Sequence, residues 1–258
     1  MTRGQCSPQD SYLPMKLSII ICVFNERKTI LDAIQQAHAV DLGPGWGNEV
    51  IVVDNFSTDG TRELLGSVDL PGVRVICHPR NLGKSASVLT GISEAGGDYF
   101  VIFDADLEYE VDDLPRMVAA IAPPSTPPPM EGAGGGMAVA VFGSRTLGGR
   151  AIYKYAKNYW GVRLLTLIAN LLYGGQLTDI AVGLKLVRLD VARALNLGGA
   201  SFDLDFELPC KLLKRGYAIP EVAVAYHPRT VEEGKKLKAF RTGFRALWVI
   251  VKTRFTNT

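Results

Sequence analysis

Four short apolar runs in the first half of the chain each end in a cluster of polar residues. The runs are largely continuous and rich in β-branched residues, which is typical of strands buried on both faces of a parallel sheet. Helical patterns separate them, so the order predicts an α/β fold with a mostly parallel central sheet flanked by helices. The runs are Lys16–Phe24, Glu49–Val53, Val73–Cys77 and Tyr99–Phe103, and the helices run from about Thr29 to Val40, from near Thr61, and up to about Ala95.

The second half of the chain predicts fewer strands and more helix. The expected elements are a strand at Met137–Phe142, helices at Ala151–Tyr173 and Phe202–Arg215, a last strand at Val222–Tyr226 and a basic amphipathic helix at Lys235–Phe255. Proline and glycine dominate the segment before Met137 and exclude regular structure there. We therefore expect a disordered leader at residues 1–14, one domain at 15–232 with a flexible insertion at 123–137, and a basic amphipathic C-terminal helix at 233–258.

Composition favours one large intracellular domain. With 258 residues, 47% of them hydrophobic, the chain can bury one substantial core. The net charge of +2 argues against nucleic-acid binding through a broad basic surface. The four cysteines lack C-x-x-C spacing and the N-terminal residues lack a signal-peptide pattern, so we expect free thiols and a cytoplasmic location. No feature of the sequence specifies an oligomeric state.

The last of the four runs is followed by two carboxylates, Asp104 and Asp106. In an extended segment residues i and i+2 point to the same side, so both side chains are expected to converge just past the strand. That edge is where open α/β sheets bind ligands. Adjacent carboxylates repel unless a cation lies between them, and Mg²⁺ or Mn²⁺ bound to a diphosphate would supply one. An Asp-x-Asp triplet also occurs in loops where it only caps a helix, so the pair alone leaves both interpretations open.

Other motifs for phosphate chemistry fail on spacing or residue type. Gly83-Lys84-Ser85 would suit a phosphate-binding loop, but that motif needs glycine where this chain has His78. No G-x-G-x-x-G follows a strand, which excludes that dinucleotide-binding motif. A phosphatase of the aspartyl-phosphate type would carry its aspartate pair after its first strand, with Thr or Val in place of Glu108.

Taken together, the strand ends resemble glycosyltransferase family 2. The resemblance extends from about Lys16 to Arg229 and rests on Val23-Phe24-Asn25-Glu26, Val53–Thr61, Asn81–Lys84 and Asp104–Glu108. It implies the GT-A fold, with a Rossmann-like nucleotide half, and inverting transfer of a sugar from a nucleotide. Within the family the chain is most similar to the polyprenyl-phosphate sugar transferases, the group of the dolichol-phosphate mannose synthases. That similarity rests on Gly143-Ser144-Arg145, Thr178-Asp179 and the segment around Arg229.

The resemblance implies a nucleotide site built from several strand ends. It places Asn25, Glu26 and Asp54 around the base and ribose. Glu26 would also suit the first turn of a helix as a capping carboxylate, and Ser57 would suit the start of the next helix. Asp54 ends a buried strand without an evident structural partner, which favours a functional role. The residues expected to bind the nucleotide and its cation are Phe24, Asn25, Glu26, Asp54, Asn55, Ser57, Lys84, Asp104, Ala105, Asp106 and Lys235.

The resemblance also implies a divalent cation, Mg²⁺ or Mn²⁺, with Asp104, Asp106 and Glu108 as its ligands. The third ligand is often glutamine in the dolichol enzymes, so Glu108 adds negative charge. Such an ion would neutralise the departing diphosphate while the sugar is attacked from the opposite face.

The expected donor is a GDP- or UDP-hexose, and the expected acceptor is a dolichyl, undecaprenyl or other polyprenyl phosphate. A phosphate monoester has a second pKa of about 6, so at neutral pH it is already a dianionic nucleophile and needs cations more than a base. Arg145 and Arg229 are expected to hold the two phosphate groups together. Asp179 aligns with the position often proposed as the base, and it would be essential only for a hydroxyl acceptor.

Two alternatives remain open from the sequence. One is a family 2 enzyme acting on a hydroxyl of a glycan or another lipid, and the other is a non-catalytic sugar-nucleotide-binding subunit. We expect peripheral contact with the cytoplasmic face of a membrane, because the C-terminal helix has the composition of a helix at an anionic bilayer. Its Leu247 and Trp248 would serve a protein core equally well. The longest apolar stretch, Trp160–Tyr173, is too short to cross a bilayer.

Overall fold

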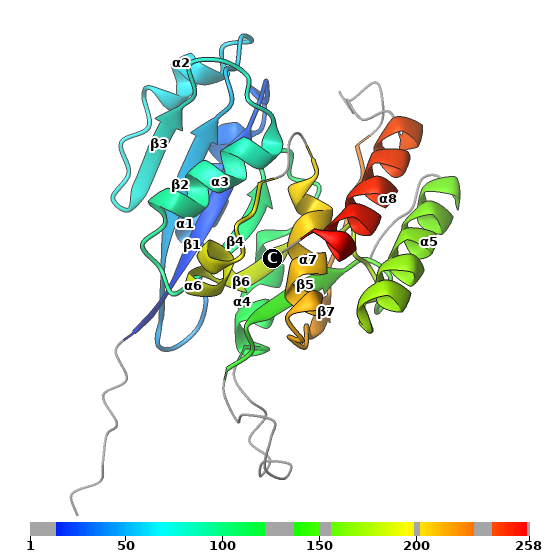
Figure 1. Ribbon diagram of the computed structural model, residues 1–258. Coiled ribbons are helices and arrows are strands. Elements are labelled where there is room, and N and C mark those ends of the chain that lie inside the picture. The colour runs from blue at the N-terminus through cyan, green and yellow to red at the C-terminus, as the bar shows by residue number, and fades with distance from the viewer. Residues whose placement is uncertain (1–13, 122–136, 150–155, 199–201, 230–238, 257–258) are drawn as a thin grey trace, which may run out of the picture.

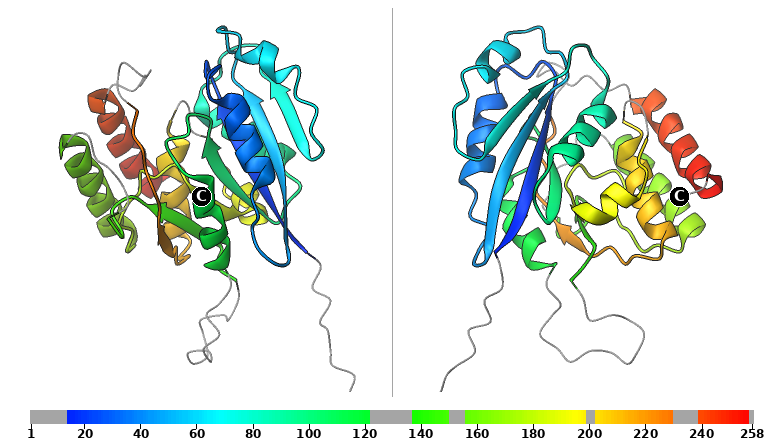
Figure 2. Two further views of the ribbon diagram at one scale, coloured as in Figure 1. Left: turned by 180° about the vertical axis from the view of Figure 1, so that it is seen from behind. Right: turned by 60° about the vertical axis from the view of Figure 1, so that its left-hand side comes forward.

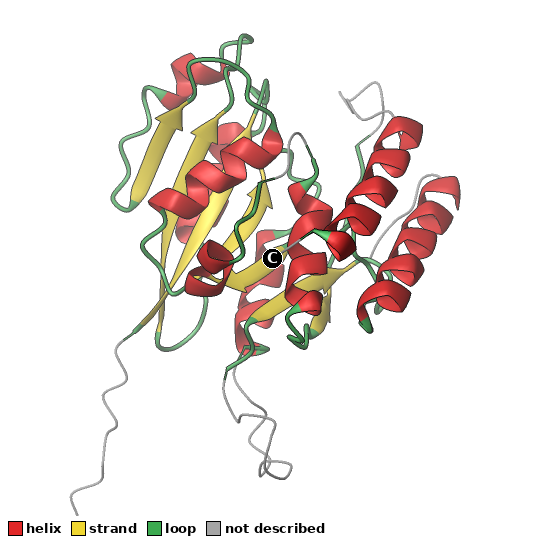
Figure 3. Ribbon diagram, in the orientation of Figure 1, coloured by secondary structure: helices red, strands yellow, loops and turns green. Residues whose placement is uncertain are grey.

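The computed structural model describes residues 14–121, 137–149, 156–198, 202–229 and 239–256. Within these ranges one sheet has the strand order β3-β2-β1-β4-β6-β5-β7 (Figures 1 and 3). The strands are β1 Met15–Val23, β2 Trp46–Asp54, β3 Val73–Cys77, β4 Tyr99–Asp104, β5 Ala140–Ser144, β6 Lys185–Arg188 and β7 Glu221–Ala223. The helices are α1 Ile30–Ala39, α2 Thr61–Leu65, α3 Lys84–Glu94, the short 3-10 helix η1 Val111–Asp113, α4 Leu114–Ala119, α5 Ala156–Tyr173, α6 Leu189–Ala194, α7 Leu204–Lys214 and α8 Ala239–Phe255.

The first four strands form the parallel half of the sheet, as the sequence predicted. β1 pairs in parallel with β2 and β4, and β2 pairs in parallel with β3. Helices α3 and α1 cover opposite faces of this half, one seen in front in Figure 1 and the other in front when the molecule is turned around in Figure 2. Ile19, Ile20 and Ile21 are therefore all fully buried. Covered faces on both sides explain why these strands read as continuous apolar runs.

Two local features bring α1 and α3 onto the sheet. α1 buries Ile30, Ala33, Ile34 and Ala37, which recur at helical spacing on one face. α3 lies so close to β1 that a Cβ on Gly91 would clash with Ile20. Because α3 follows the parallel strand β3, its N-terminus lies at the carboxyl ends of the strands, and this close packing keeps the helix against the sheet.

The second half of the sheet is mixed, which the sequence did not reveal. β6 runs antiparallel to both β4 and β5, and β7 is parallel to β5. β6 has only four residues and no prediction covered it. β5 spans Ala140–Ser144 rather than the predicted Met137–Phe142, because pairing with β6 and β7 sets its register. This half extends the sheet so that β5 and β7 end near the cavity described below.

Helices α5, α7 and α8 lie together at the end of the molecule formed by this second half (Figure 1). α5 and α8 pack against each other, and Tyr173 Oη donates a hydrogen bond to the Ile250 carbonyl at 2.7 Å. Among the residues that the structure describes, no helix combines the length and apolar character that a membrane-spanning segment needs. Residues 1–13, 122–136 and 230–238 lie outside the described ranges, so the leader, the insertion and the role of Lys235 stay predictions.

Candidate active site

A cavity of about 410 Å³ lies at the carboxyl ends of β1 and β4. Its walls also come from α3, from the start of α7 and from the segments that follow β5 and β7. The predicted site residues that line it are Phe24, Glu26, Asn55, Lys84, Asp104, Ala105, Asp106, Glu108, Arg145 and Arg229. The predicted residues Asn25, Asp54, Ser57 and Asp179 are not among the residues that line it.

Asp104 and Asp106 both line the cavity, as expected, but not through strand alternation: β4 ends at Asp104, Ala105 and Asp106 form a turn, and Ala105 lines the cavity too. Lys84 Nζ lies 2.8 Å from Asp104 Oδ1, and Arg229 Nη2 lies 3.3 Å from Asp106 Oδ2. Burial, together with the charges of Asp104 and Glu108, raises the pKa of Asp106 to about 7. The cavity thus crowds negative charge at one point, and two basic side chains partly neutralise it.

The third expected metal ligand, Glu108, bonds to other groups. Its Oε2 accepts a hydrogen bond from Tyr226 Oη at 2.8 Å, and its Oε1 accepts one from the backbone N–H of Arg229 at 2.8 Å. In the described part of the chain, no group of three or more His, Cys, Asp or Glu side chains is arranged to hold a metal ion. The expected set of three carboxylates is therefore not preassembled. Glu108 instead fixes the segment that follows β7.

Arg229 reaches from the segment after β7 to the end of β1. Its Nη1 and Nη2 lie 2.8 and 3.1 Å from the two carboxylate oxygens of Glu26. These hydrogen bonds, followed by the charge of Asp106, raise the pKa of Arg229 above the already high value of a free arginine. Its guanidinium is therefore always charged. Its Nε is buried and has no hydrogen-bond partner within the described residues. A guanidinium with an unused donor in a cavity suits an anionic oxygen.

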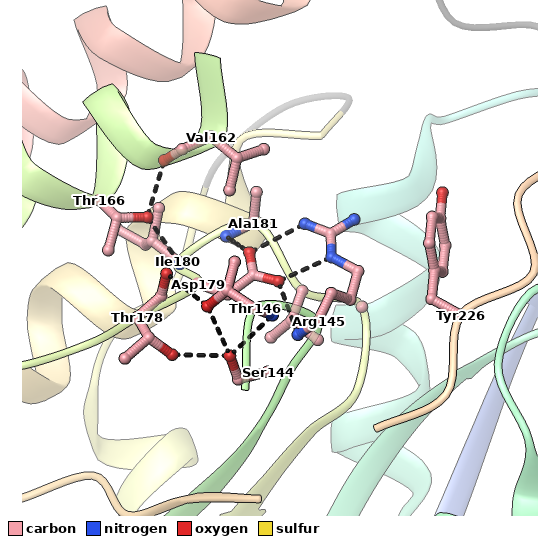
Figure 4. Close-up of polar contacts among 12 residues, drawn as sticks. Ser144, Arg145, Thr146, Val162, Thr166, Thr178, Asp179, Ile180, Ala181 and Tyr226 are labelled. Carbon is pink, nitrogen blue, oxygen red and sulfur yellow. Dashed lines mark hydrogen bonds and ion pairs between the residues drawn. The ribbon is translucent and has the colours of Figure 1, made fainter. Parts of the chain in front are cut away.

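Arg145 and Asp179 form a buried ion pair with two parallel contacts (Figure 4). Arg145 Nε lies 2.7 Å from Asp179 Oδ2, and Arg145 Nη2 lies 2.9 Å from Oδ1. Asp179 is fully buried, whereas Arg145 lines the cavity with its guanidinium 5.1 Å from the centre of the Tyr226 ring. Burial alone would raise the pKa of Asp179, but Arg145 outweighs it and holds that pKa below the usual value. The carboxylate orients a cation and is a weak proton acceptor.

Buried polar contacts hold the loop that carries Asp179. The Glu221 carboxylate accepts hydrogen bonds from the backbone N–H groups of Thr178 and Asp179, at 2.7 and 3.1 Å. Thr166 Oγ1, on α5, accepts one from the backbone N–H of Ile180 at 3.2 Å (Figure 4). The position of the arginine therefore depends on β7 and α5 as well as on its own strand.

The start of α7 forms another wall of the cavity. The backbone N–H of Leu204 donates to Ser85 Oγ at 3.1 Å, which ties α7 to the first turn of α3. Asp205 consequently comes within 3.8 Å of Lys84 Nζ. Burial alone would lower the pKa of Lys84, but Asp104 and Asp205 raise it well above the usual value. Lys84 is therefore a charged cavity residue held between two carboxylates.

Hydrogen bonds join the segments that follow β1 and β2. Asn25 has a left-handed backbone with φ of 57°, its N–H donates to Ser57 Oγ at 2.9 Å, and its Oδ1 accepts from the Thr58 N–H at 2.8 Å. Asp54 is fully buried and lies 2.7 Å from Arg62 Nε. Arg62 is the structural partner that the sequence did not reveal. The burial of Asp54 therefore no longer argues for a functional role, and Ser57 links the two segments rather than capping α2.

Comparison with known families agrees with the predicted resemblance. Residues 18–126 match the family model described as "Glycosyl transferase family 2". Residues 18–126 are therefore similar to glycosyl transferase family 2. Curated relatives match part of the chain. An undecaprenyl-phosphate 4-deoxy-4-formamido-L-arabinose transferase of Salmonella paratyphi A is 31% identical over 110 residues, covering 40% of this chain and 33% of the relative. A dolichol-phosphate mannosyltransferase of Pyrococcus furiosus is 34% identical over 108 residues, covering 42% and 30%. The matches thus span about a third of each relative's length.

Solved structures resemble the matched region and the C-terminal half together. The glucosyl-3-phosphoglycerate synthase of Mycobacterium tuberculosis, crystallised with Mn²⁺, uridine diphosphate and glucosyl-3-phosphoglycerate, has a TM-score of 0.65 at 18% identity, covering 100% of this chain and 88% of that one. The same protein with Mg²⁺ and uridine diphosphate has a TM-score of 0.61 at 18% identity, covering 95% and 81%. The likeness confirms the predicted GT-A fold.

Several cavity residues escaped the sequence prediction, among them Tyr109, Phe202, Asp205 and Tyr226. Tyr226 ends a predicted strand just before the predicted Arg229, and this place at a strand end was the available signal. Phe202 and Asp205 begin a predicted helix and carry no local signal, since they reach the cavity only because α7 packs on α3.

Proposed function

We propose that this protein is an inverting hexosyltransferase that moves a sugar from a GDP- or UDP-sugar to a polyprenyl phosphate, with Mg²⁺ or Mn²⁺. The observation that carries the proposal is the meeting of Asp104 and Asp106 with Arg145 and Arg229 in one cavity at the strand ends. Carboxylates suit a cation bound to a leaving diphosphate, and arginines suit the phosphate groups themselves. The names of the two relatives, which refer to undecaprenyl and dolichol phosphate, support this choice of acceptor.

Asp104 and Asp106 are the proposed ligands of the divalent cation. Two adjacent carboxylates offer the oxygen donors that Mg²⁺ and Mn²⁺ prefer. Burial, followed by the charges of Asp104 and Glu108, raises the pKa of Asp106 to about 7, and a bound cation would relieve the part that comes from charge repulsion. When bound, the ion would neutralise the leaving diphosphate. Lys84 holds Asp104 in place and adds positive charge on the same side. Glu108 serves to hold Arg229 and Tyr226.

The nucleoside is proposed to lie against Phe24, Glu26 and Asn55, which line the cavity at the ends of β1 and β2. The carboxylate oxygens of Glu26 would suit ring N–H and ribose hydroxyl groups, whereas Asn55 Oδ1 already accepts the backbone N–H of Leu82 at 2.8 Å and shapes the wall. Asn25 and Asp54 are assigned an indirect part, because their hydrogen bonds shape the two segments that present these residues.

The two arginines are proposed to bind the phosphate groups of donor and acceptor. Arg145 is held by Asp179 in one orientation, and Arg229 has an unused Nε donor. The acceptor phosphate is already dianionic at neutral pH, so no protein base has to remove a proton from it. Asp179 is therefore assigned as a positioning residue for Arg145, which agrees with its burial and its lowered pKa.

The test is release of nucleoside diphosphate from a panel of GDP- and UDP-sugars, with each component omitted in turn. We expect release only when sugar nucleotide, Mn²⁺ or Mg²⁺ and polyprenyl phosphate are all present. A thermal shift with sugar nucleotide and Mn²⁺ reports donor binding separately, because a ligand that binds the native state raises its apparent stability. Donor binding without turnover across the panel would contradict the proposal and favour a non-catalytic sugar-nucleotide-binding subunit.

We also propose that transfer takes place at the cytoplasmic face of a membrane, where a polyprenyl phosphate would be met. In the described ranges the cysteines Cys22, Cys77 and Cys210 are free thiols, which supports a reducing compartment.

A further inference from the structure

Helices α5 and α8 each expose a stripe of large apolar side chains. The stripe on α5 consists of Trp160, Leu164, Leu167 and Leu171, and the stripe on α8 consists of Phe244, Trp248, Val251 and Phe255. Both follow the spacing i, i+4, i+7 and i+11, so each stripe lies along one side of its helix. Their exposures range from 39% to 80%. The two helices lie side by side at one end of the molecule (Figures 1 and 2).

Other residues of α5 and α8 make the contacts with the protein core. α8 packs on the protein through Ala246, Val249 and Ile250, which are buried. α5 packs through Thr166 and Ala169, also buried. The stripes lie on the remaining sides of two neighbouring helices, and exposed apolar side chains gathered in this way are typical of an interaction site.

The charge of the two helices indicates what that partner is. Neither helix contains an acidic residue, and the basic residues whose side chains are described are Arg163, Arg245, Lys252 and Arg254, of which Arg245 is paired with Asp203. The whole chain has a net charge of only +2, so positive charge is concentrated here. Lys252 Nζ lies 4.6 Å from the centre of the Trp248 ring, so a cation and an exposed indole share one part of the surface.

We propose that the α5–α8 face docks on an anionic lipid bilayer. Apolar side chains flanked by basic ones are the composition of helices that lie in the headgroup region. Two of the three tryptophans of the chain, Trp160 and Trp248, lie on this face, and indole rings favour that region. A second copy of the chain fits less well. A two-fold interface would set the basic residues of one copy against those of the other, and neither helix has an acidic residue to pair with them.

Polar contacts connect α5 and α8 to segments that form the candidate active site. The link to a lipid acceptor rests on the proposed function. On its inner side, α5 bonds to the loop of Asp179: the Asn170 side chain donates to the Leu177 carbonyl at 2.8 Å, and its Oδ1 accepts from the Leu177 N–H at 3.0 Å. On α8, Arg245 Nη2 lies 3.0 Å from Asp203 Oδ2, at the start of α7. A polyprenyl phosphate in the bilayer would thus meet the protein beside the elements that hold Arg145.

The test is flotation of the full chain with vesicles, without donor or divalent cation. Wild type is expected to bind vesicles made of equal parts phosphatidylcholine and phosphatidylglycerol and to bind pure phosphatidylcholine less. The double variant Trp160→Glu, Trp248→Glu should lose at least about tenfold in partition coefficient, because it removes one indole from each stripe and adds negative charge. Leu31→Glu is the matched control: Leu31 is 43% exposed on α1, outside the face, and its change should leave binding intact.

A transfer assay separates this inference from the proposed function. The double variant should keep the wild-type rate with a short, water-soluble polyprenyl phosphate and lose it with the same headgroup on a long chain in vesicles. Equal vesicle binding by wild type and double variant would overturn the inference. So would a concentration-dependent dimer in sedimentation that the double variant abolishes, since the face would then belong to a second copy. If the double variant loses vesicle binding but wild type transfers sugar to neither acceptor, docking would be supported and the proposed transfer contradicted.

Discussion

Two arginine–carboxylate pairs reach the cavity, and they are held in different ways. The side chains of Arg145 and Asp179 are 10% and 0% exposed, and those of Arg229 and Glu26 are 22% and 15% exposed. Asp179 makes two contacts with one guanidinium and lies outside the cavity lining. Glu26 lines the cavity, and its arginine also contacts Asp106.

This difference in burial indicates that Arg145 is held in a fixed position, whereas Arg229 can exchange its partners. A buried ion pair costs desolvation, which only good geometry and added hydrogen bonds offset, and the loop around Asp179 supplies both. The partners of Arg229 are groups that we propose for donor and cation, so ligand binding competes with its ion pairs. We therefore propose that the Arg145 pair presets a site for the acceptor phosphate, while donor binding can rearrange the Arg229 pair.

The largest expected effect tests the donor side. Asp104→Asn should lower kcat/KM by about 10²–10³-fold, by analogy with the loss of one group that stabilises transition-state charge. It should also abolish the Mn²⁺-dependent part of the thermal shift with sugar nucleotide. The measurement is steady-state release of nucleoside diphosphate, with Asp112→Asn as control, because Asp112 is exposed outside the cavity and undergoes the same chemical change. Unchanged metal dependence in Asp104→Asn would refute the assignment.

The comparison itself is tested by removing one carboxylate from each pair. Asp179→Asn should lower the free energy of unfolding by about 3 kcal/mol, because it leaves a buried guanidinium without its counterion. Glu26→Gln should lower it by less than about 1 kcal/mol, because that pair is partly exposed and Arg229 retains Asp106. Urea unfolding monitored by circular dichroism measures both. Equal losses would show that the two pairs are not held differently.

The same Asp179→Asn variant also distinguishes the acceptors. Transfer to a phosphate should weaken but persist, because Arg145 keeps its charge while losing its orientation. Complete loss of transfer, at a protein concentration where the variant is folded, would indicate a base and hence a hydroxyl acceptor.

Lys185 offers a further test, because it is a basic side chain buried more completely than either arginine. Lys185 is fully buried on β6, and burial lowers its pKa from 10.5 to about 8. Between these two values the unfolded chain binds more protons than the folded one, so stability rises with pH across that window. Below it, the buried charge costs roughly 3 kcal/mol. The stability of wild type relative to Lys185→Met should therefore rise by that order between about pH 7 and about pH 10.5, as urea unfolding at the two pH values would measure. A difference independent of pH would contradict the lowered pKa.

The smallest expected effect concerns the support of the fixed pair. Thr166→Val removes the acceptor for the Ile180 N–H and should cost about 1 kcal/mol of stability. It should raise KM for the phosphate acceptor more than KM for the donor, which serves as the internal control. An equal rise in both would mean that α5 does not act through the Arg145 side.

The parallel half of the fold was predictable because its signals are local. A strand covered on both faces must be continuously apolar, and a strand end at the binding edge must turn polar within a few residues. Asp104 and Asp106 were expected at one point because they follow a buried strand, although a turn at Ala105 and Asp106, rather than strand alternation, brings both to the cavity. The ends of β1 and β2 followed in the same way, whereas the nucleotide-binding roles expected for Glu26 and Asn55 came from the family resemblance.

The second half depended on contacts between distant segments. β6 has four residues and owes its place to antiparallel pairing with β4 and β5, and no local pattern specifies that pairing. Arg62 and Asp54 carry no sign of each other in the sequence, so the structural role of Asp54 appeared only when α2 was placed. Glu108 follows the two aspartates at the same spacing, yet its carboxylate turns to Tyr226 and the backbone of Arg229, from a strand more than a hundred residues away.

The sequence by itself determined the α/β class, the binding edge and the acidic groups on it, because burial along one segment is a short-range property. The tertiary structure decided which cation meets which carboxylate. That outcome depends on the register of β5, β6 and β7 and on the docking of α5 and α7, where long-range pairing balances the desolvation of each charge.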